Sequence, residues 1–134
     1  MRTLSEQEVK SLRERVNDVW DWKKYYWYPL MPTSRPDVFA LDTDKFDQAI
    51  SEEKVKTALT EIGITKVFNL RELGESEELD IKDIPYLYES ESVIIDESME
   101  WIIYCSHEQS VAFGGAKLNE KIKNLVPNWK ELEW

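Results

Sequence analysis

The residues from Trp101 to Phe113 constrain the fold of this chain more than any other segment. Trp101–Cys105 (WIIYC) is a run of apolar and aromatic residues and is the strongest strand signal in the sequence. Ser110–Phe113 (SVAF) is a second run of this kind, and His107–Gln109 between them favour a hairpin turn. The segment therefore predicts two neighbouring antiparallel strands.

The N-terminal residues predict a helix. Either Thr3 with Glu6 or Ser5 with Glu8 fits a capping box, in which a hydroxyl and a carboxylate bind free backbone N–H groups. An apolar stripe then recurs at helical spacing. It consists of Val9, Leu12, Val16, Val19 and Trp20.

Two further helices and four further strands are expected along the chain. One helix is predicted to begin at a cap on Ser51 and to end before Gly63, and the other to cover Lys117–Leu125. The polar segment Gly74–Asp83 is expected to be a loop. The further strands are expected at Val38–Leu41, Ile64–Leu70, Tyr86–Tyr88 and Ser92–Ile95.

This order of elements predicts an α+β fold. We expect an antiparallel sheet of about four or five strands with helices packed on one face. The 134 residues are sufficient for one core, so residues 1–134 are expected to form a single globular domain.

The acidic residues are concentrated between Glu75 and Glu100. Ten acids and one base, Lys82, give this stretch a charge of −9, out of −10 for the whole chain. We therefore predict one contiguous negative surface that binds a basic protein and repels nucleic acid. The candidate contacts are Glu75, Glu77, Glu78, Glu89, Glu91, Asp96 and Glu97.

Aromatic residues are dense between Trp20 and Tyr28, more than one helix can bury. Trp and Tyr are common both in cores and in protein interfaces, so the cluster is either all core or partly exposed. Trp22, Tyr26 and Trp27 are the candidate anchors for a partner. The segment that follows contains three prolines within eight residues and predicts extended, loop-like chain.

Other features limit the cellular setting and the chemistry. No apolar run approaches the roughly 20 residues that a membrane span requires, so we expect a cytoplasmic protein with no membrane partner. One cysteine and one histidine do not build a typical zinc site without several carboxylates, and no metal or other cofactor is expected. A lone cysteine in an apolar strand is typical of a buried, unreactive thiol.

The string WIIYCSHEQSVAFGG, preceded by the acidic YESESVIIDESMEW, resembles small proteins of Gram-positive bacteria. Many of these look like immunity proteins for polymorphic toxins or contact-dependent inhibition systems. The likeness lies in the W-I-x-Y-x-S-H-E pattern, the size, the acidity and the tryptophan content, and it covers the C-terminal half. It implies a non-enzymatic binding protein that neutralises a basic toxin enzyme, such as a nuclease.

The alternative is a small enzyme or ligand-binding domain that uses Cys105, His107 and Glu108. Strand alternation would place Cys105 and His107 on one face, and Glu108 would orient the imidazole from the turn.

Overall fold

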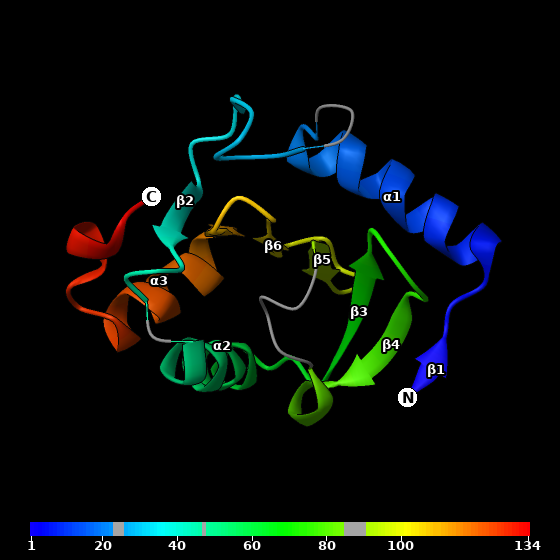
Figure 1. Ribbon diagram of the computed structural model, residues 1–134. Coiled ribbons are helices and arrows are strands. Elements are labelled where there is room, and N and C mark those ends of the chain that lie inside the picture. The colour runs from blue at the N-terminus through cyan, green and yellow to red at the C-terminus, as the bar shows by residue number, and fades with distance from the viewer. Residues whose placement is uncertain (23–25, 47, 85–90) are drawn as a thin grey trace.

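A single antiparallel sheet contains every strand in the part of the chain that the structure describes (Figure 1). The computed structural model describes residues 1–22, 26–46, 48–84 and 91–134, with residues 48–51 described by their backbone alone. The strand order across the sheet is β1-β4-β3-β5-β6-β7-β2. The strands are β1 (Arg2–Thr3), β2 (Val38–Asp42), β3 (Lys66–Arg71), β4 (Glu77–Asp80), β5 (Ser92–Ile95), β6 (Ile102–Cys105) and β7 (Ser110–Gly114).

The α+β class and the antiparallel sheet are confirmed, but the expected strand number is wrong. The sheet has seven strands because β1 and β4, neither of which was expected, extend one edge of it. Strand β4, Glu77–Asp80 (EELD), lies in the segment predicted to be a loop. The prediction missed it because three of its four residues are acids, which give little strand signal. Its backbone nevertheless pairs with β3 on one side and with β1 on the other. The strand expected at Tyr86–Tyr88 lies outside the described residues.

Helices cover both faces of the sheet, which corrects the prediction of helices on one face. The helices are α1 (Glu6–Trp20), α2 (Gln48–Glu61) and α3 (Ala116–Leu125), and short 3₁₀ helices follow at Ile81–Asp83 and Trp129–Leu132. Figure 1 shows α1 on one side and α2 and α3 on the other. The reason is that all residues of β5 and β6 are buried, so both faces of these strands need a cover.

Two hydrophobic cores follow from this arrangement. In the first, α2 and α3 pack on the face of the sheet that carries Ile94, Ile103 and Cys105. In the second, α1 packs on the opposite face, which carries Ile95 and Tyr104. We refer to these faces as the α2–α3 face and the α1 face.

The ends of α1 and α2 show which local sequence signals predict a helix boundary correctly. Ser5 and Glu8 form the capping box of α1. The buried stripe of α1 is narrower than predicted, since Val19, which was expected on it, is 38% exposed. Helix α2 begins at Gln48, so Ser51 lies inside the helix rather than at its cap. Gly63 has the expected left-handed backbone, with φ of +89°.

The aromatic cluster is partly core and partly surface. Trp20 and Trp27 are completely buried, and the Trp27 indole N–H donates a hydrogen bond of 2.7 Å to the Trp20 carbonyl. Tyr26, by contrast, is 37% exposed. Among the described residues, no helix combines the length and the apolar character that a membrane span requires.

Candidate functional site

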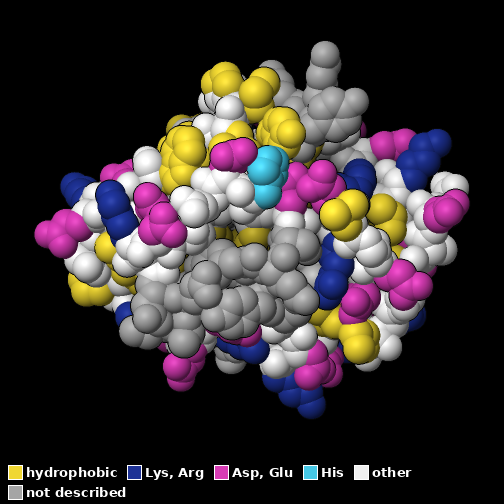
Figure 2. Space-filling model, in the orientation of Figure 1, with side chains coloured by type: hydrophobic (Ala, Val, Ile, Leu, Met, Phe, Trp, Pro, Cys, Tyr) yellow, Lys and Arg dark blue, Asp and Glu magenta, His cyan; other side chains and the backbone are white. Residues whose placement is uncertain are grey.

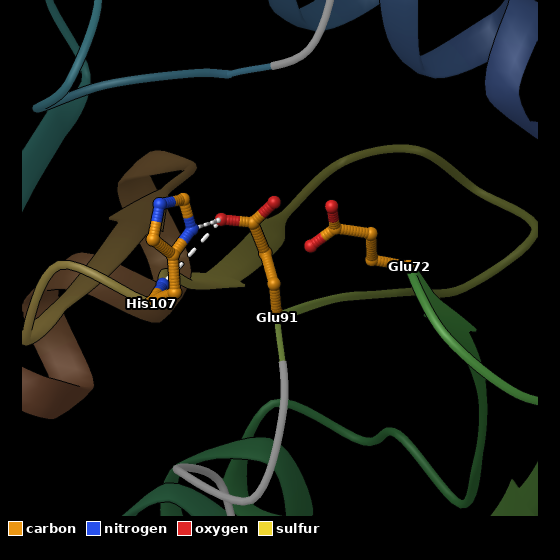
Figure 3. A group of neighbouring side chains, drawn as sticks. All are labelled: Glu72, Glu91 and His107. Carbon is orange, nitrogen blue, oxygen red and sulfur yellow. Dashed lines mark hydrogen bonds and ion pairs between the residues drawn. The ribbon is translucent and has the colours of Figure 1, made fainter.

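Three ionisable side chains from distant parts of the sequence meet where three neighbouring strands end, along one margin of the sheet (Figure 3). Glu72 directly follows β3, Glu91 directly precedes β5, and His107 lies in the turn between β6 and β7. Their carboxylate and imidazole atoms all lie within 4.8 Å of one another. We refer to Glu72, Glu91 and His107 as the edge cluster.

Strand pairing brings the edge cluster together. Strands β3 and β5 are antiparallel neighbours, so the end of β3 lies beside the start of β5, where the Glu72 N–H donates to the Glu91 carbonyl at 3.0 Å. Strand β6 pairs with the other side of β5, and this pairing places the end of β6 at the same edge. The topology, rather than sequence proximity, therefore builds the site.

Glu91 is the centre of the edge cluster. It is buried, and its Oε1 accepts hydrogen bonds from the Tyr104 hydroxyl at 2.8 Å and from His107 Nδ1 at 2.7 Å. Burial and the adjacent Glu91 raise the pKa of Tyr104, so this phenol keeps its proton and remains a donor. Glu91 is thus held in one position by two donors.

His107 connects the cluster to the surface. Its side chain is 47% exposed, its Nε2 lies 3.2 Å from the Glu108 carboxylate, and its ring centroid lies 5.6 Å from that of Tyr26. The hydrogen bond with Glu91 raises the pKa of His107 above the ordinary value, because it favours the imidazolium form. A hydrogen bond of 3.0 Å from Ser106 N–H to the Ser110 carbonyl closes the turn that carries it.

Glu72 places a second carboxyl group against Glu91. Figure 3 shows its carboxyl oxygens directed toward Glu91. The proximity of Glu91 raises the pKa of Glu72, because two neighbouring carboxylates repel each other while a shared proton stabilises the pair. A cation would relieve the same repulsion. The arrangement is therefore suited to binding a positive group.

A cavity of about 360 Å³ opens beside the edge cluster, on the α1 face. Its wall includes the Trp22 ring, which packs edge-on against Tyr104 with centroids 4.9 Å apart. Arg13 of α1 also lines it and donates a hydrogen bond of 3.0 Å to the Arg71 carbonyl. The lining residues are Arg13, Trp22, Leu70, Glu72, Glu91, Ser92, Val93 and Tyr104.

The predicted contiguous negative surface is wrong for the described acids. Glu77 and Glu78 are adjacent in β4 and so point to opposite faces, where they form ion pairs with Arg71 at 3.6 Å and Arg2 at 3.5 Å. Glu91 and Asp96 flank opposite ends of β5. Strand alternation and strand length thus distribute the charges around the sheet.

The other predicted contacts lie in several places. Glu78, Asp96 and Glu97 line a hollow of about 300 Å³ at the end of β5 opposite the edge cluster. Glu75 is exposed in the turn before β4, and Glu89 lies outside the described residues. Of the predicted acids that the structure describes, only Glu91 belongs to the edge cluster.

The predicted aromatic anchors also separate. Trp27 cannot contact a partner because it has no exposed surface, which corrects its prediction as an anchor. Trp22 is partly buried in the cavity wall, and Tyr26 is exposed beside His107.

The hypothesis of a Cys105–His107 pair is also wrong. Cys105 is buried in the core on the α2–α3 face, and burial raises the pKa of its thiol to about 12. The predicted burial is therefore confirmed. Strand alternation ends at Cys105, and the turn carries His107 to Glu91 and Tyr104 on the α1 face.

Glu72 and Tyr104 were not predicted as members of the site. Glu72 is one of 27 acids and carries no distinguishing signal, while Tyr104 reads as an ordinary strand residue. Only the pairing of β3 with β5 reveals that Glu72 and Glu91 are neighbours.

Comparisons with protein-family models, with curated proteins and with solved structures find no match to this chain.

Proposed function

We propose that this protein acts by binding another protein, as an immunity-type inhibitor that neutralises a basic toxin enzyme such as a nuclease. The observation that carries the proposal is a surface on which the exposed Tyr26 ring lies beside His107 and its acidic neighbours. We call it the aromatic–acidic surface and define it by Tyr26, Glu72, His107 and Glu108. The resemblance of the C-terminal half to immunity proteins points to the same class of function.

The composition of this surface fits a protein interface. Tyr26 is 37% exposed, and tyrosine is enriched in protein interfaces. Figure 2 shows hydrophobic side chains gathered above the histidine, with Asp and Glu side chains directly beside it. An exposed aromatic next to carboxylates can pack against the aliphatic part of a lysine or arginine while the carboxylate binds its charge.

The net charge supports a basic partner even though the acids are dispersed. A charge of −10 on 134 residues attracts a positively charged protein over long range. The groove of a nuclease is positive because it binds phosphate, so opposed fields would accelerate the encounter. Specific contacts are then assigned to the aromatic–acidic surface rather than to the whole acidic stretch.

A cytoplasmic site of action is part of the proposal. The single cysteine is a buried free thiol, which suits a reducing compartment. The enzyme alternative that depends on Cys105 is not retained, because its thiol faces the opposite core.

The proposal is tested with a partner captured from the source cell by the purified chain and then identified. We expect a basic enzyme whose activity is abolished by a stoichiometric amount of the chain. Tyr26→Ala should weaken the complex by about tenfold or more, as expected for a truncated aromatic anchor.

Glu120→Gln is the matched control because Glu120 is exposed on α3, which packs on the other face of the sheet. It should bind the partner like the parent chain. A partner that keeps full activity in the complex, or one that binds Tyr26→Ala as tightly as the parent, would exclude the proposed function at this surface.

A further inference from the structure

We propose that Glu72, Glu91 and His107 form a binding site for one divalent transition-metal ion, with zinc as its closest chemical fit. This inference concerns the purified chain alone and does not depend on the proposed function. It revises the expectation from the sequence that no metal is bound, because the sequence did not show which carboxylates lie beside the histidine.

The donor set suits such an ion. One imidazole nitrogen and two carboxylates are ligands that zinc accepts at about 2.0–2.2 Å, so ligand atoms around one ion lie up to about 4 Å apart. The corresponding atoms of the edge cluster lie within 4.8 Å of one another. Small side-chain rotations at Glu72 and His107, both exposed, therefore suffice to close around an ion.

The surrounding hydrogen bonds are those that metal ligands require. His107 Nε2 lies 3.2 Å from Glu108, so when the ion occupies Nδ1 the Nε2 proton can be donated to that carboxylate. A metal-binding imidazole typically donates its other N–H to a carboxylate in this way. The Tyr104 hydroxyl holds Glu91 by a hydrogen bond of 2.8 Å. Glu108 and Tyr104, which make these two hydrogen bonds, are not themselves proposed as ligands.

Ion binding would replace the proton that links His107 to Glu91. In the metal-free protein, the 2.7 Å separation between Nδ1 and Oε1 is a hydrogen bond. When the ion enters, this proton leaves to solvent if His107 is an imidazolium, or is replaced by one on Nε2 if the ring is neutral, and both atoms become ligands. The ion also cancels the repulsion between the carboxylates of Glu72 and Glu91, which face each other in Figure 3.

The neighbouring cavity leaves room for a fourth ligand. Glu72 and Glu91 line both the cluster and the cavity of about 360 Å³. Three protein ligands with one open position is the arrangement found when zinc also binds water or a small ligand. Mg²⁺ should bind more weakly, because it prefers six oxygen ligands and gains little from imidazole.

The test is a calorimetric titration of chelator-treated full-length protein with Zn²⁺ at neutral pH. We expect one ion per chain, and Glu72→Gln and His107→Gln should each weaken binding by about tenfold or more. Glu75→Gln is the matched control, because it removes one acid at the same end of the strands but outside the cluster. It should bind Zn²⁺ like the parent chain.

A second readout uses the only histidine of the chain. Its imidazole proton resonances should change with the first equivalent of Zn²⁺ and respond little to the same amount of Mg²⁺. This measurement on the parent chain remains decisive if a variant does not fold. Absence of stoichiometric binding, an unperturbed histidine, or equal affinity of Glu72→Gln and the parent would overturn the proposal.

Discussion

At the scale of single residues, the hydrogen-bond partners of Glu91 determine the chemistry of the site. Tyr104 and His107 both donate to the same carboxylate oxygen. The sequence predicted Glu91 as a contact for a partner and His107 as a residue of the enzyme or ligand-binding alternative. Their pairing depends on the end of β6 lying beside the start of β5. A sequence pattern identifies candidate residues but does not identify which of them are neighbours.

The pair predicts how His107 titrates in the metal-free protein. Its pKa should lie above the ordinary 6.5, and Glu91→Gln should lower it toward that value. Because the pKa is raised by folding, the stabilisation from this pair is complete below pH 6.5 and is lost as the pH rises through the folded pKa. Proton NMR of the single histidine measures both values. The same pKa in parent and variant would contradict the pairing.

Cys105 gives an independent prediction about the core. Burial raises the pKa of its thiol to about 12 and leaves the residue 1% exposed, so it should react slowly with a thiol reagent at neutral pH and quickly after denaturation. The rate of labelling in the two states measures this directly. Fast labelling of the folded protein would place Cys105 outside the core on the α2–α3 face.

At the scale of elements, the contact between α1 and the sheet depends on one small residue. A Cβ atom at Gly114 would lie 2.7 Å from the Trp20 ring and 2.7 Å from Ile102. Gly114 therefore allows the C-terminal end of α1 to pack directly on β7. This close approach helps to fix the position of α1 on the face of the sheet where the cavity and the edge cluster lie.

Gly114→Ala should destabilise the protein by about 1–3 kcal/mol, because the added methyl group overpacks this contact. Chemical denaturation of parent and variant measures the free energy of unfolding. Lys117→Ala, at an exposed position of α3, is a control that should change stability much less. An unchanged stability of Gly114→Ala would contradict the position of Trp20 against β7.

The sequence predicted elements whose signal is local and missed those that depend on tertiary pairing. The capping box of α1 and the hairpin of β6 and β7 follow from residues that are adjacent in the chain. Strand β4 was missed because three acids weaken its intrinsic preference, while pairing on both sides stabilises it. The two-sided burial of β5 was visible in its run of apolar residues and should have indicated helices on both faces.

At the scale of the whole molecule, charge and contact surface have separate roles. The described acids between Glu75 and Glu100 flank opposite ends and faces of the sheet, and two of them, Glu77 and Glu78, form ion pairs with nearby bases. Their sum still gives the molecule a net charge of −10. We therefore expect attraction to come from the whole charge and specificity to come from the aromatic–acidic surface.

The association rate with the basic partner, measured against salt concentration, tests this account most directly. Charges on the surface are screened beyond about 8–10 Å at physiological ionic strength, so the rate should fall steeply as salt is added. Tyr26→Ala should leave the association rate and its salt dependence nearly unchanged and should mainly raise the dissociation rate. An association rate insensitive to salt, together with unchanged dissociation of Tyr26→Ala, would contradict recognition by this charge and this surface.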